Sequence, residues 1–110
     1  MNSEQLYIQL KKIQEPKGYF FNNNKRLVLE LLDGLIANKD RYGYMGCPCR
    51  LSSGDRDHDK DIICPCVYRT PDVDEFGTCY CSLYVSREWN EEKVDKQYVP
   101  ERRPPEKLFF

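Results

Sequence analysis

Apolar residues recur every four positions between residues 27 and 36, in two adjacent rows. The rows are Leu27, Leu31 and Leu35, and beside them Val28, Leu32 and Ile36. This spacing places all six side chains on one face of an amphipathic helix. The asparagine cluster at 22–24 can cap the free amides at its start, and Gly43 can end it. We therefore predict a helix from about residue 24 to residue 41.

A second, weaker helical pattern covers residues 4 to 14. Leu6, Leu10 and Ile13 share one helical face before a proline and a glycine interrupt the pattern. We expect the two helices to pack together. The three consecutive aromatic residues at 19–21 are interpreted as core rings between the helices, because aromatic side chains supply large buried surface.

Glycine and proline become frequent after residue 42 and break any long periodicity. We predict loops and short helical turns there, with little or no sheet. The alternating charges of residues 55–61 favour a solvated connector. A short helix is expected within residues 86–95, because Ser86 can cap it, and the proline-rich segment 99–105 should be extended.

The chain is short enough for one domain, with 110 residues. We predict a mainly α fold, a small single domain of helices around a loop-borne cofactor, spanning residues 1–110. Its parts would be a helical N-terminal part (1–43), a loop region (44–85), and a short helix with an extended tail (86–110). A net charge of -1 gives no electrostatic reason to bind nucleic acid or an anionic membrane, so we expect protein partners.

The N-terminal residues lack the basic and apolar regions of a signal peptide, and no stretch approaches the roughly 20 apolar residues of a membrane span. We therefore expect a cytoplasmic protein. Structural disulfides are disfavoured in a reducing cytosol, where clustered cysteines more often bind metal or catalyse redox reactions.

Six cysteines carry the candidate chemistry of the chain. They form three Cys-x-Cys pairs, namely Cys47-Pro48-Cys49, Cys64-Pro65-Cys66 and Cys79-Tyr80-Cys81. Thiolate is both a soft ligand for iron–sulfur clusters or zinc and the nucleophile of disulfide exchange. Six thiols can therefore supply the four ligands of a metal centre and leave two thiols that are not ligands.

The spacing within the pairs favours an iron–sulfur cluster over zinc. A zinc ion with bonds of ~2.3 Å holds its four sulfurs only about 3.8 Å apart, and structural zinc sites use Cys-x₂₋₄-Cys knuckles. Proline between two cysteines extends the backbone, so their Cα atoms should lie roughly 6 to 7 Å apart. A four-iron cluster suits that spacing better. A disulfide framework is disfavoured by the low cysteine content and the lack of a secretion signal.

The order of the three pairs resembles the catalytic chain of ferredoxin-thioredoxin reductase and related ferredoxin-dependent disulfide reductases. The resemblance covers most of the chain. It includes the helix before the first pair, the glycine-rich approach at 42–46, Arg50 after the first pair, and the tail at 99–107. Three paired cysteines in this order are a specific signal for the family.

The resemblance implies a role for each cysteine. Cys47, Cys64, Cys66 and Cys79 would bind a 4Fe-4S cluster. Cys49 and Cys81 would form a redox-active disulfide, with Cys49 the exposed, attacking member and Cys81 the one nearer the cluster. Ferredoxin or another low-potential carrier would supply single electrons, and a thioredoxin-like or glutaredoxin-like protein would be reduced. A variable-type partner subunit is a further implied partner.

The sequence departs from the family pattern at two places. Tyr80 stands where photosynthetic members have a histidine, and a phenol with a pKa near 10 is a weaker proton source than an imidazole. His58 is a candidate substitute, although its charged surroundings favour a solvated loop residue. The acidic stretch 70–77 resembles an insertion that changes the surface shown to a partner. These departures suggest a non-photosynthetic member of the family.

Two other functions remain open from the sequence. The first is a zinc-stabilised protein-interaction module with two incidental thiols. The second is a simple iron–sulfur electron carrier without disulfide chemistry. Metal content under oxygen-free conditions separates zinc from iron, and a count of thiols that appear only after reduction separates a carrier from a reductase.

Overall fold

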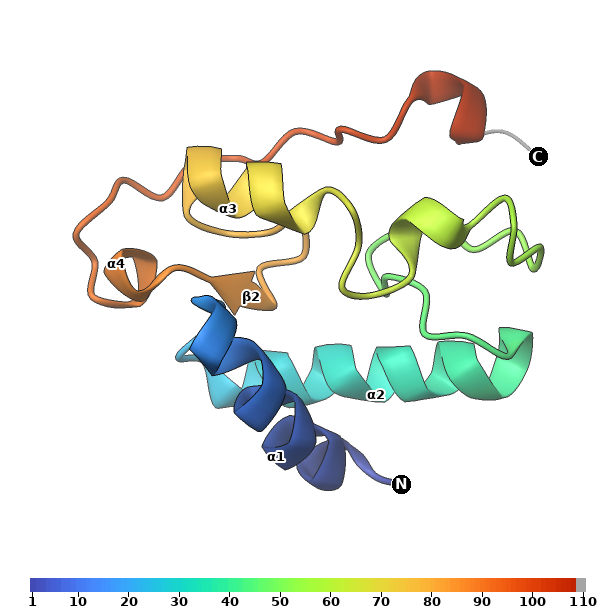
Figure 1. The fold of residues 1–110 in the computed structure, drawn as a ribbon, viewed down its shortest axis with the longest axis horizontal. Coiled ribbons are helices and arrows are strands. Elements are labelled where there is room, and N and C mark those ends of the chain that lie inside the picture. The colour runs from blue at the N-terminus through green and yellow to red at the C-terminus, as the bar shows by residue number, and fades with distance from the viewer. Residues whose placement is uncertain (109–110) are drawn as a thin grey trace.

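The computed structural model of this chain describes residues 1–108, so the last two residues of the predicted domain lie outside the described part. Figure 1 shows α2 along one side of the molecule with α1 crossing it, and α3 with the C-terminal tail along the other side. The helices are α1 (Ser3–Gln14), α2 (Lys25–Tyr42), α3 (Arg69–Phe76) and α4 (Arg87–Asn90), with 3-10 turns η1 (Glu15–Lys17), η2 (Lys60–Ile62) and η3 (Pro105–Lys107). The predicted mainly α class is confirmed.

Within residues 1–108, sheet is confined to one short pairing of strands, besides two isolated bridges. β1 (Phe20–Phe21) pairs antiparallel with β2 (Tyr84–Val85), which brings the region after the last cysteine pair back to the N-terminal helices. None of the described helices is long and apolar enough to cross a membrane.

Helix α2 follows the prediction from the sequence to within one residue at each end. The Asn24 side chain accepts a hydrogen bond from the Leu27 amide at 3.2 Å, and Gly43 ends the helix with a φ of +88°. That positive φ is easily adopted by glycine, which has no Cβ. Val28, Leu32 and Leu35 are buried at the centre of the core.

Helix α1 packs against α2 as predicted. Asn2 and Gln5 form a reciprocal capping box at its start, and Leu6 is buried in the core. Ile13 departs from the predicted apolar face, because it is 51% exposed. Gln14 is buried instead, and its side-chain oxygen accepts a hydrogen bond from Arg69 at 2.7 Å. A polar contact therefore fixes the end of α1.

The aromatic run at 19–21 is only partly a core element. Phe21 is buried, and its ring stacks between those of Tyr7 and Tyr84 at centroid distances of 4.9 and 5.4 Å. Tyr19 and Phe20 are only partly buried. Alternation along β1 explains the difference between Phe20 and Phe21, since neighbouring strand residues point to opposite faces, and Tyr19 precedes the strand.

Helix α3 is an element that the sequence analysis missed. It occupies most of the acidic stretch that was interpreted as a surface insertion. Asp72 within it is fully buried, which corrects that interpretation for this residue. Its ion-pair partner Arg102 also binds Glu75, so the tail is fastened along α3. Pro71 in the first turn and Gly77 after the last residue are the signals that could have revealed the helix.

The C-terminal segment agrees in part with the sequence. Ser86 caps α4 as predicted, with its hydroxyl accepting from the Trp89 amide at 3.1 Å, but the helix ends at Asn90. Residues 95–104 contain no helix or strand, and Figure 1 shows them as a drawn-out trace that leads to η3. The predicted extended segment 99–105 therefore holds up to Pro104, since Pro105 begins η3.

The prediction of a solvated connector at 55–61 holds for its exposed residues, Asp55, Arg56, Asp57 and Lys60, and is wrong for Asp59. Asp59 is fully buried and accepts a hydrogen bond from the Tyr44 hydroxyl at 2.6 Å. Arg103 from the tail pairs with Asp59 at 3.4 Å and with Asp61 at 3.0 Å. The counter-ion lies far along the chain, which is why a local charge pattern could not show it.

Helix α2 also approaches the first Cys-Pro-Cys pair closely. A Cβ atom built on Gly34 would lie 2.8 Å from the Cβ of Pro48. Glycine therefore allows the backbone of α2 to support the loop that carries Cys47 and Cys49.

We expect Gly34→Ala to destabilise the protein by about 1 kcal/mol, although the same change in an open helix would stabilise it by a similar amount. The added methyl group must displace Pro48. Urea denaturation measures the effect, with Asp33→Ala on the exposed side of the same helix as the control. A net gain in stability for Gly34→Ala would contradict the close approach.

The buried Asp59 carboxylate generates a pH-dependent prediction. Burial raises its pKa, but hydrogen bonds from Tyr44, Ser53 and Arg103 outweigh burial and hold the pKa below its usual range. A lowered folded-state pKa stabilises the fold above the unfolded-state value and loses that contribution as pH falls through the folded-state value.

We therefore expect Asp59→Asn to cost about 3 kcal/mol at pH 7, because it leaves Arg103 with one counter-ion fewer. The difference from the wild type should shrink below about pH 4. Urea midpoints at pH 7 and pH 3 measure it, with the exposed Asp57→Asn as the control. An equal deficit at both pH values would show that charge is not the cause.

Candidate active site

Backbone pairing brings the first two cysteine pairs together. The Cys47 amide donates to the Ile62 carbonyl and the Cys64 amide donates to the Met45 carbonyl, each at 2.8 Å. The two segments thus run antiparallel, with an isolated bridge between Gly46 and Ile63. Cys47 and Cys64 are consequently neighbours although 16 residues lie between them in the printed sequence.

The third cysteine pair lies in the turn between the two arms of a small hairpin. Thr78 and Val85 form an antiparallel bridge, and the Cys79 amide donates to the Tyr84 carbonyl at 2.9 Å. The Tyr84 amide in turn donates to the Cys79 sulfur at 3.4 Å. The hairpin therefore orients Cys79 toward the protein interior, where its residue exposure is 5%.

Five of the six cysteines line one pocket, and the sixth lies outside it. The five are Cys47, Cys64, Cys66, Cys79 and Cys81. Cys49 is exposed and lines a separate surface groove together with Tyr80, Tyr98 and other residues. Cys49 is thus the thiol most accessible to solvent, while the other five are buried or half-buried.

All six cysteines are free thiols in this structure. The sulfurs of Cys47 and Cys81 lie 3.3 Å apart, which makes Cys81 a direct neighbour of a predicted cluster ligand. The predicted Cys49–Cys81 disulfide is not formed here and stays a prediction.

Contacts among the thiols shift their pKa values in different directions. Hydrogen bonds from the Cys49 and Cys81 thiols lower the pKa of Cys47 to about 3. The hydrogen bond between Cys49 and Cys47 raises the pKa of Cys49 to about 11. A hydrogen bond with Cys81 lowers the pKa of Cys79, whereas burial raises that of Cys64. Hydrogen bonds between thiols therefore lower the pKa values of Cys47 and Cys79 and raise that of Cys49.

Arg50 is the cation nearest to these sulfurs among the contacts of the described residues. Its Nη1 lies 3.6 Å from the sulfurs of both Cys47 and Cys66. Its Nε and Nη2 bind both carboxylate oxygens of Glu101 at 2.7–3.0 Å. The side chain is only 1% exposed, so this charge acts in a poorly solvated environment.

A second buried arginine lines the same pocket. Arg69 donates to Gln14 and lies over the ring of Tyr19, with its Cζ 3.7 Å from the ring centroid. Tyr84 also lines the pocket, and its buried hydroxyl has no hydrogen-bond partner. A pocket with thiol donors, two cations and an unpaired polar group fits an anionic, sulfur-ligated group.

The structure contains no preformed site for a single ion in its described part. Within residues 1–108, no group of three or more His, Cys, Asp or Glu side chains is arranged to hold a metal ion. The candidate centre is therefore defined by its sulfur donors and their surroundings.

The two candidate proton donors lie in different environments. Burial raises the pKa of Tyr80, whose ring centroid is 4.5 Å from Arg50 Cζ. His58 is half-buried, and its Nε2 lies 3.0 Å from the Lys107 carbonyl oxygen. His58 is thus engaged with the C-terminal tail, which corrects the expectation of a solvated loop residue.

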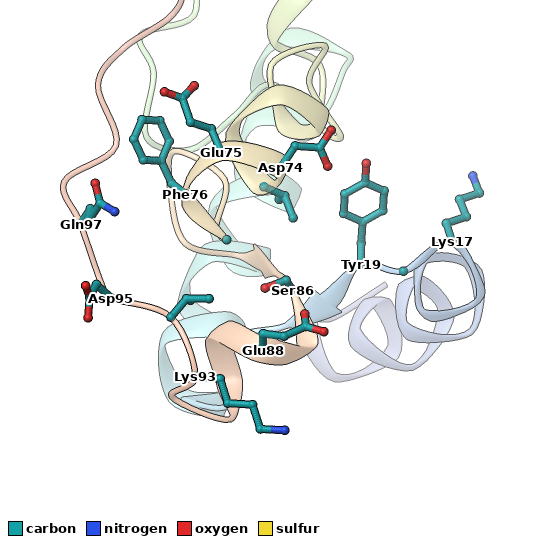
Figure 2. Close-up of a pocket in the computed structure, with 14 residues that line it drawn as sticks. Lys17, Tyr19, Asp74, Glu75, Phe76, Ser86, Glu88, Lys93, Asp95 and Gln97 are labelled. Atoms are coloured by element: carbon teal, nitrogen blue, oxygen red, sulfur yellow. The ribbon is translucent and has the colours of Figure 1, made fainter.

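Another groove lies away from the cysteines. Figure 2 shows it between the end of α3, α4 and the extended segment that follows α4. Its lining includes the acidic residues Asp74, Glu75, Glu88 and Asp95 and no cysteine. It supplies no redox-active group.

A small helical domain whose loops place five thiols in one pocket and a sixth in a groove beside it has the features of thiol-dependent redox proteins. Comparison with known proteins specifies the family. Residues 2–103 match the family of the ferredoxin thioredoxin reductase catalytic beta chain, and the chain belongs to that family. The predicted family is confirmed, and with it the oxidoreductase class.

Two relatives carry the same name, ferredoxin-thioredoxin reductase, catalytic chain. The protein from Guillardia theta is 29% identical over 91 residues, covering 74% of this chain and 82% of the relative. The protein from Porphyra purpurea is 29% identical over 93 residues, covering 83% of this chain and 75% of the relative.

Arg50 and the tail are signalled in the sequence only through the family resemblance, and their contacts could not be predicted from it. Glu101 binds Arg50, while Arg69 and Tyr84 line the thiol pocket. Each of these contacts joins residues far apart in the chain. No local motif signals them, although a buried arginine next to a cysteine pair would be expected to need an acidic partner.

Proposed function

We propose that this protein is an iron–sulfur disulfide reductase. It takes electrons one at a time from ferredoxin or another low-potential carrier and reduces a thioredoxin-like or glutaredoxin-like protein. The observation that carries the proposal is the division of the cysteines. Five line one pocket, whereas Cys49 lies in an exposed groove beside it.

The proposed cofactor is a 4Fe-4S cluster held by Cys47, Cys64, Cys66 and Cys79. When bound, it would accept single electrons and pass them to the neighbouring cysteine pair. These four cysteines line one pocket together with Cys81, and the buried cations of Arg50 and Arg69 line it too, which supports an anionic group held there. The Tyr84 amide that donates to the Cys79 sulfur is a further contact of the kind that stabilises cluster ligands.

Cys49 and Cys81 would carry the disulfide chemistry. Cys49 gives up its proton and its thiolate attacks a sulfur of the substrate disulfide, which forms a mixed disulfide and releases one substrate thiolate that takes up a proton. The Cys81 thiolate then attacks the Cys49 sulfur, forms the Cys49–Cys81 bond and releases the second substrate thiol. Two electrons and two protons restore both cysteines. The exposure of Cys49 and the partial burial of Cys81 support these separate roles.

The energetics of this reaction are favourable. A plant-type ferredoxin near -400 mV and a thioredoxin near -270 mV differ by ~130 mV, which is about 6 kcal/mol for two electrons. Reduction of the protein disulfide therefore runs toward the dithiol product.

The groove at Cys49 indicates how a protein substrate would be recognised. Its lining consists of Cys49, Tyr80, Ser82, Gln97, Tyr98 and Val99, with no Asp, Glu, Lys or Arg. Tyr98 is 83% exposed. An uncharged groove with an exposed ring suits an extended segment bound through backbone hydrogen bonds and aromatic contact. A variable-type partner subunit remains a prediction from the family resemblance.

Substitutions at two cysteines test the division of roles. We expect Cys49→Ser to abolish disulfide reduction while the oxygen-free protein keeps about four irons and its absorbance near 400 nm. Cys64→Ser should lose the cluster. Iron analysis, visible spectra and an anaerobic reduction assay with thioredoxin-like proteins measure these outcomes.

The same measurements discriminate the alternatives. A colourless, zinc-containing wild type prepared without oxygen would favour the interaction module. Iron without two reduction-dependent thiols would favour the simple carrier. Iron loss in Cys49→Ser together with iron retention in Cys64→Ser would reverse the assignment of the residues.

Tyr98→Ala tests the substrate groove. Because the side chain is exposed, its removal should leave the fold intact and raise KM for a protein disulfide about 5-fold, with little change in kcat. KM should also depend weakly on salt, since the groove has no charged lining. Ile13→Ala, an exposed change on α1, is the control. Equal KM values for both variants would remove Tyr98 from the interface.

A further inference from the structure

Arg50 occupies a position that its pairing with Glu101 alone does not explain. The side chain is 1% exposed, and one edge of the guanidinium binds the Glu101 carboxylate. Nη1, at the other edge, faces the sulfurs of Cys47 and Cys66, each at 3.6 Å. A buried arginine that needed only a counter-ion would have no reason to contact two sulfurs from different cysteine pairs.

Two aromatic rings hold the guanidinium in this orientation. Its Cζ lies 5.2 Å from the ring centroid of Tyr68 and 4.5 Å from that of Tyr80. Both distances are within the range of cation–π attraction. The Tyr68 hydroxyl is itself anchored, because it donates to Asp61 at 2.6 Å. Arg50 is thus fixed on several sides, and the planar fork loses little further freedom when it donates to sulfur.

Glu101 is fixed as firmly as its partner. Its Oε1 accepts hydrogen bonds from the Arg50 side chain and from the Arg103 amide at 2.9 Å. The Glu101 carboxylate lies on the side of the guanidinium away from the sulfur contacts. The Arg50 guanidinium therefore lies between the sulfurs of Cys47 and Cys66 on one side and the Glu101 carboxylate on the other.

We propose that Arg50 and Glu101 set the reduction potential of the centre held by Cys47 and Cys66. Arg50 raises the potential through its charge and its contacts with two ligand sulfurs. Glu101 is a positioning residue that orients Arg50 and offsets part of its charge. The inference rests on the proposed function, because it requires that these cysteines hold an iron–sulfur cluster.

The sign of each effect follows from electrostatics. Reduction adds negative charge at the centre, so a nearby cation stabilises the reduced form and raises the potential. A nearby carboxylate does the opposite. Hydrogen bonds to ligand sulfurs act in the same direction as the cation, because they stabilise electron-rich sulfur. Burial preserves these effects, since little solvent screens them.

The test compares the midpoint potentials of four variants with that of the wild type, by redox titration of oxygen-free holoprotein followed by electron paramagnetic resonance. We expect a more negative potential for Arg50→Gln and a less negative one for Glu101→Gln, whose amide oxygen can still accept hydrogen bonds. The potential of the double variant should lie between that of Arg50→Gln and that of the wild type. Arg102→Gln is the matched control, because Arg102 is the next residue of the tail and pairs with Asp72 and Glu75 on α3 instead.

Opposite shifts in the two single variants separate charge from structural damage. Arg102→Gln should lower the urea midpoint, because it leaves the buried Asp72 unpaired, yet leave the potential unchanged. Shifts of the same sign for Arg50→Gln and Glu101→Gln, or no shift in either, would overturn the proposal. If Arg50→Gln loses its iron, Glu101→Gln decides by the sign of its shift.

Iron content separates this inference from the proposed function. A wild type that holds no cluster when prepared without oxygen overturns both. A wild type with four irons, active in disulfide reduction, whose potential is the same with and without the Arg50 charge, overturns only this inference.

Discussion

Buried ion pairs between the C-terminal tail and the cysteine loops are the constraint on which the rest of the structure depends. The side chains of Arg50 and Arg103 are each 1% exposed, and their partners are Glu101 on the tail and Asp59 on a loop. A buried charge that loses its partner costs several kcal/mol, so each pair demands one arrangement of both segments. Loops with little regular structure thereby acquire a defined shape, which helix packing alone could not impose.

This constraint explains how so small a domain can keep thiols in different environments. Helix α2 supports the first pair through the approach of Gly34 to Pro48, and the second pair is held by backbone bonds to the first. The tail closes over the other side and supplies Tyr98 and Val99 to the groove at Cys49. Position thus sets the accessibility of each thiol: the buried and half-buried sulfurs line the pocket, and the exposed Cys49 sulfur is the one that a partner protein can reach.

The sequence revealed those features whose causes are local. Helix α2 was predictable because its apolar period, the Asn24 cap and the glycine at its end, Gly43, all lie within one stretch. The family was predictable from the order of the three cysteine pairs. Helix α3 was missed because its short acidic sequence lacks a strong apolar face. The buried state of Asp59 was missed because its counter-ion is Arg103, which a charge pattern over residues 55–61 cannot show. Local chemistry sets elements and donor types, whereas burial depends on contacts between distant segments.

Tyr80 shows how such a contact changes the meaning of a substitution. The resemblance noted in the sequence implies a histidine between the last two cysteines of photosynthetic family members. By itself, a tyrosine at that position suggests a weaker proton donor. In the structure its ring lies against Arg50, and an aromatic ring attracts a guanidinium through its electron-rich face. A protonated imidazole at the same place would repel Arg50 in a poorly solvated site. The tyrosine is therefore coupled to the arginine beside the thiol pocket, and its neutral ring allows a buried cation to remain next to two sulfurs.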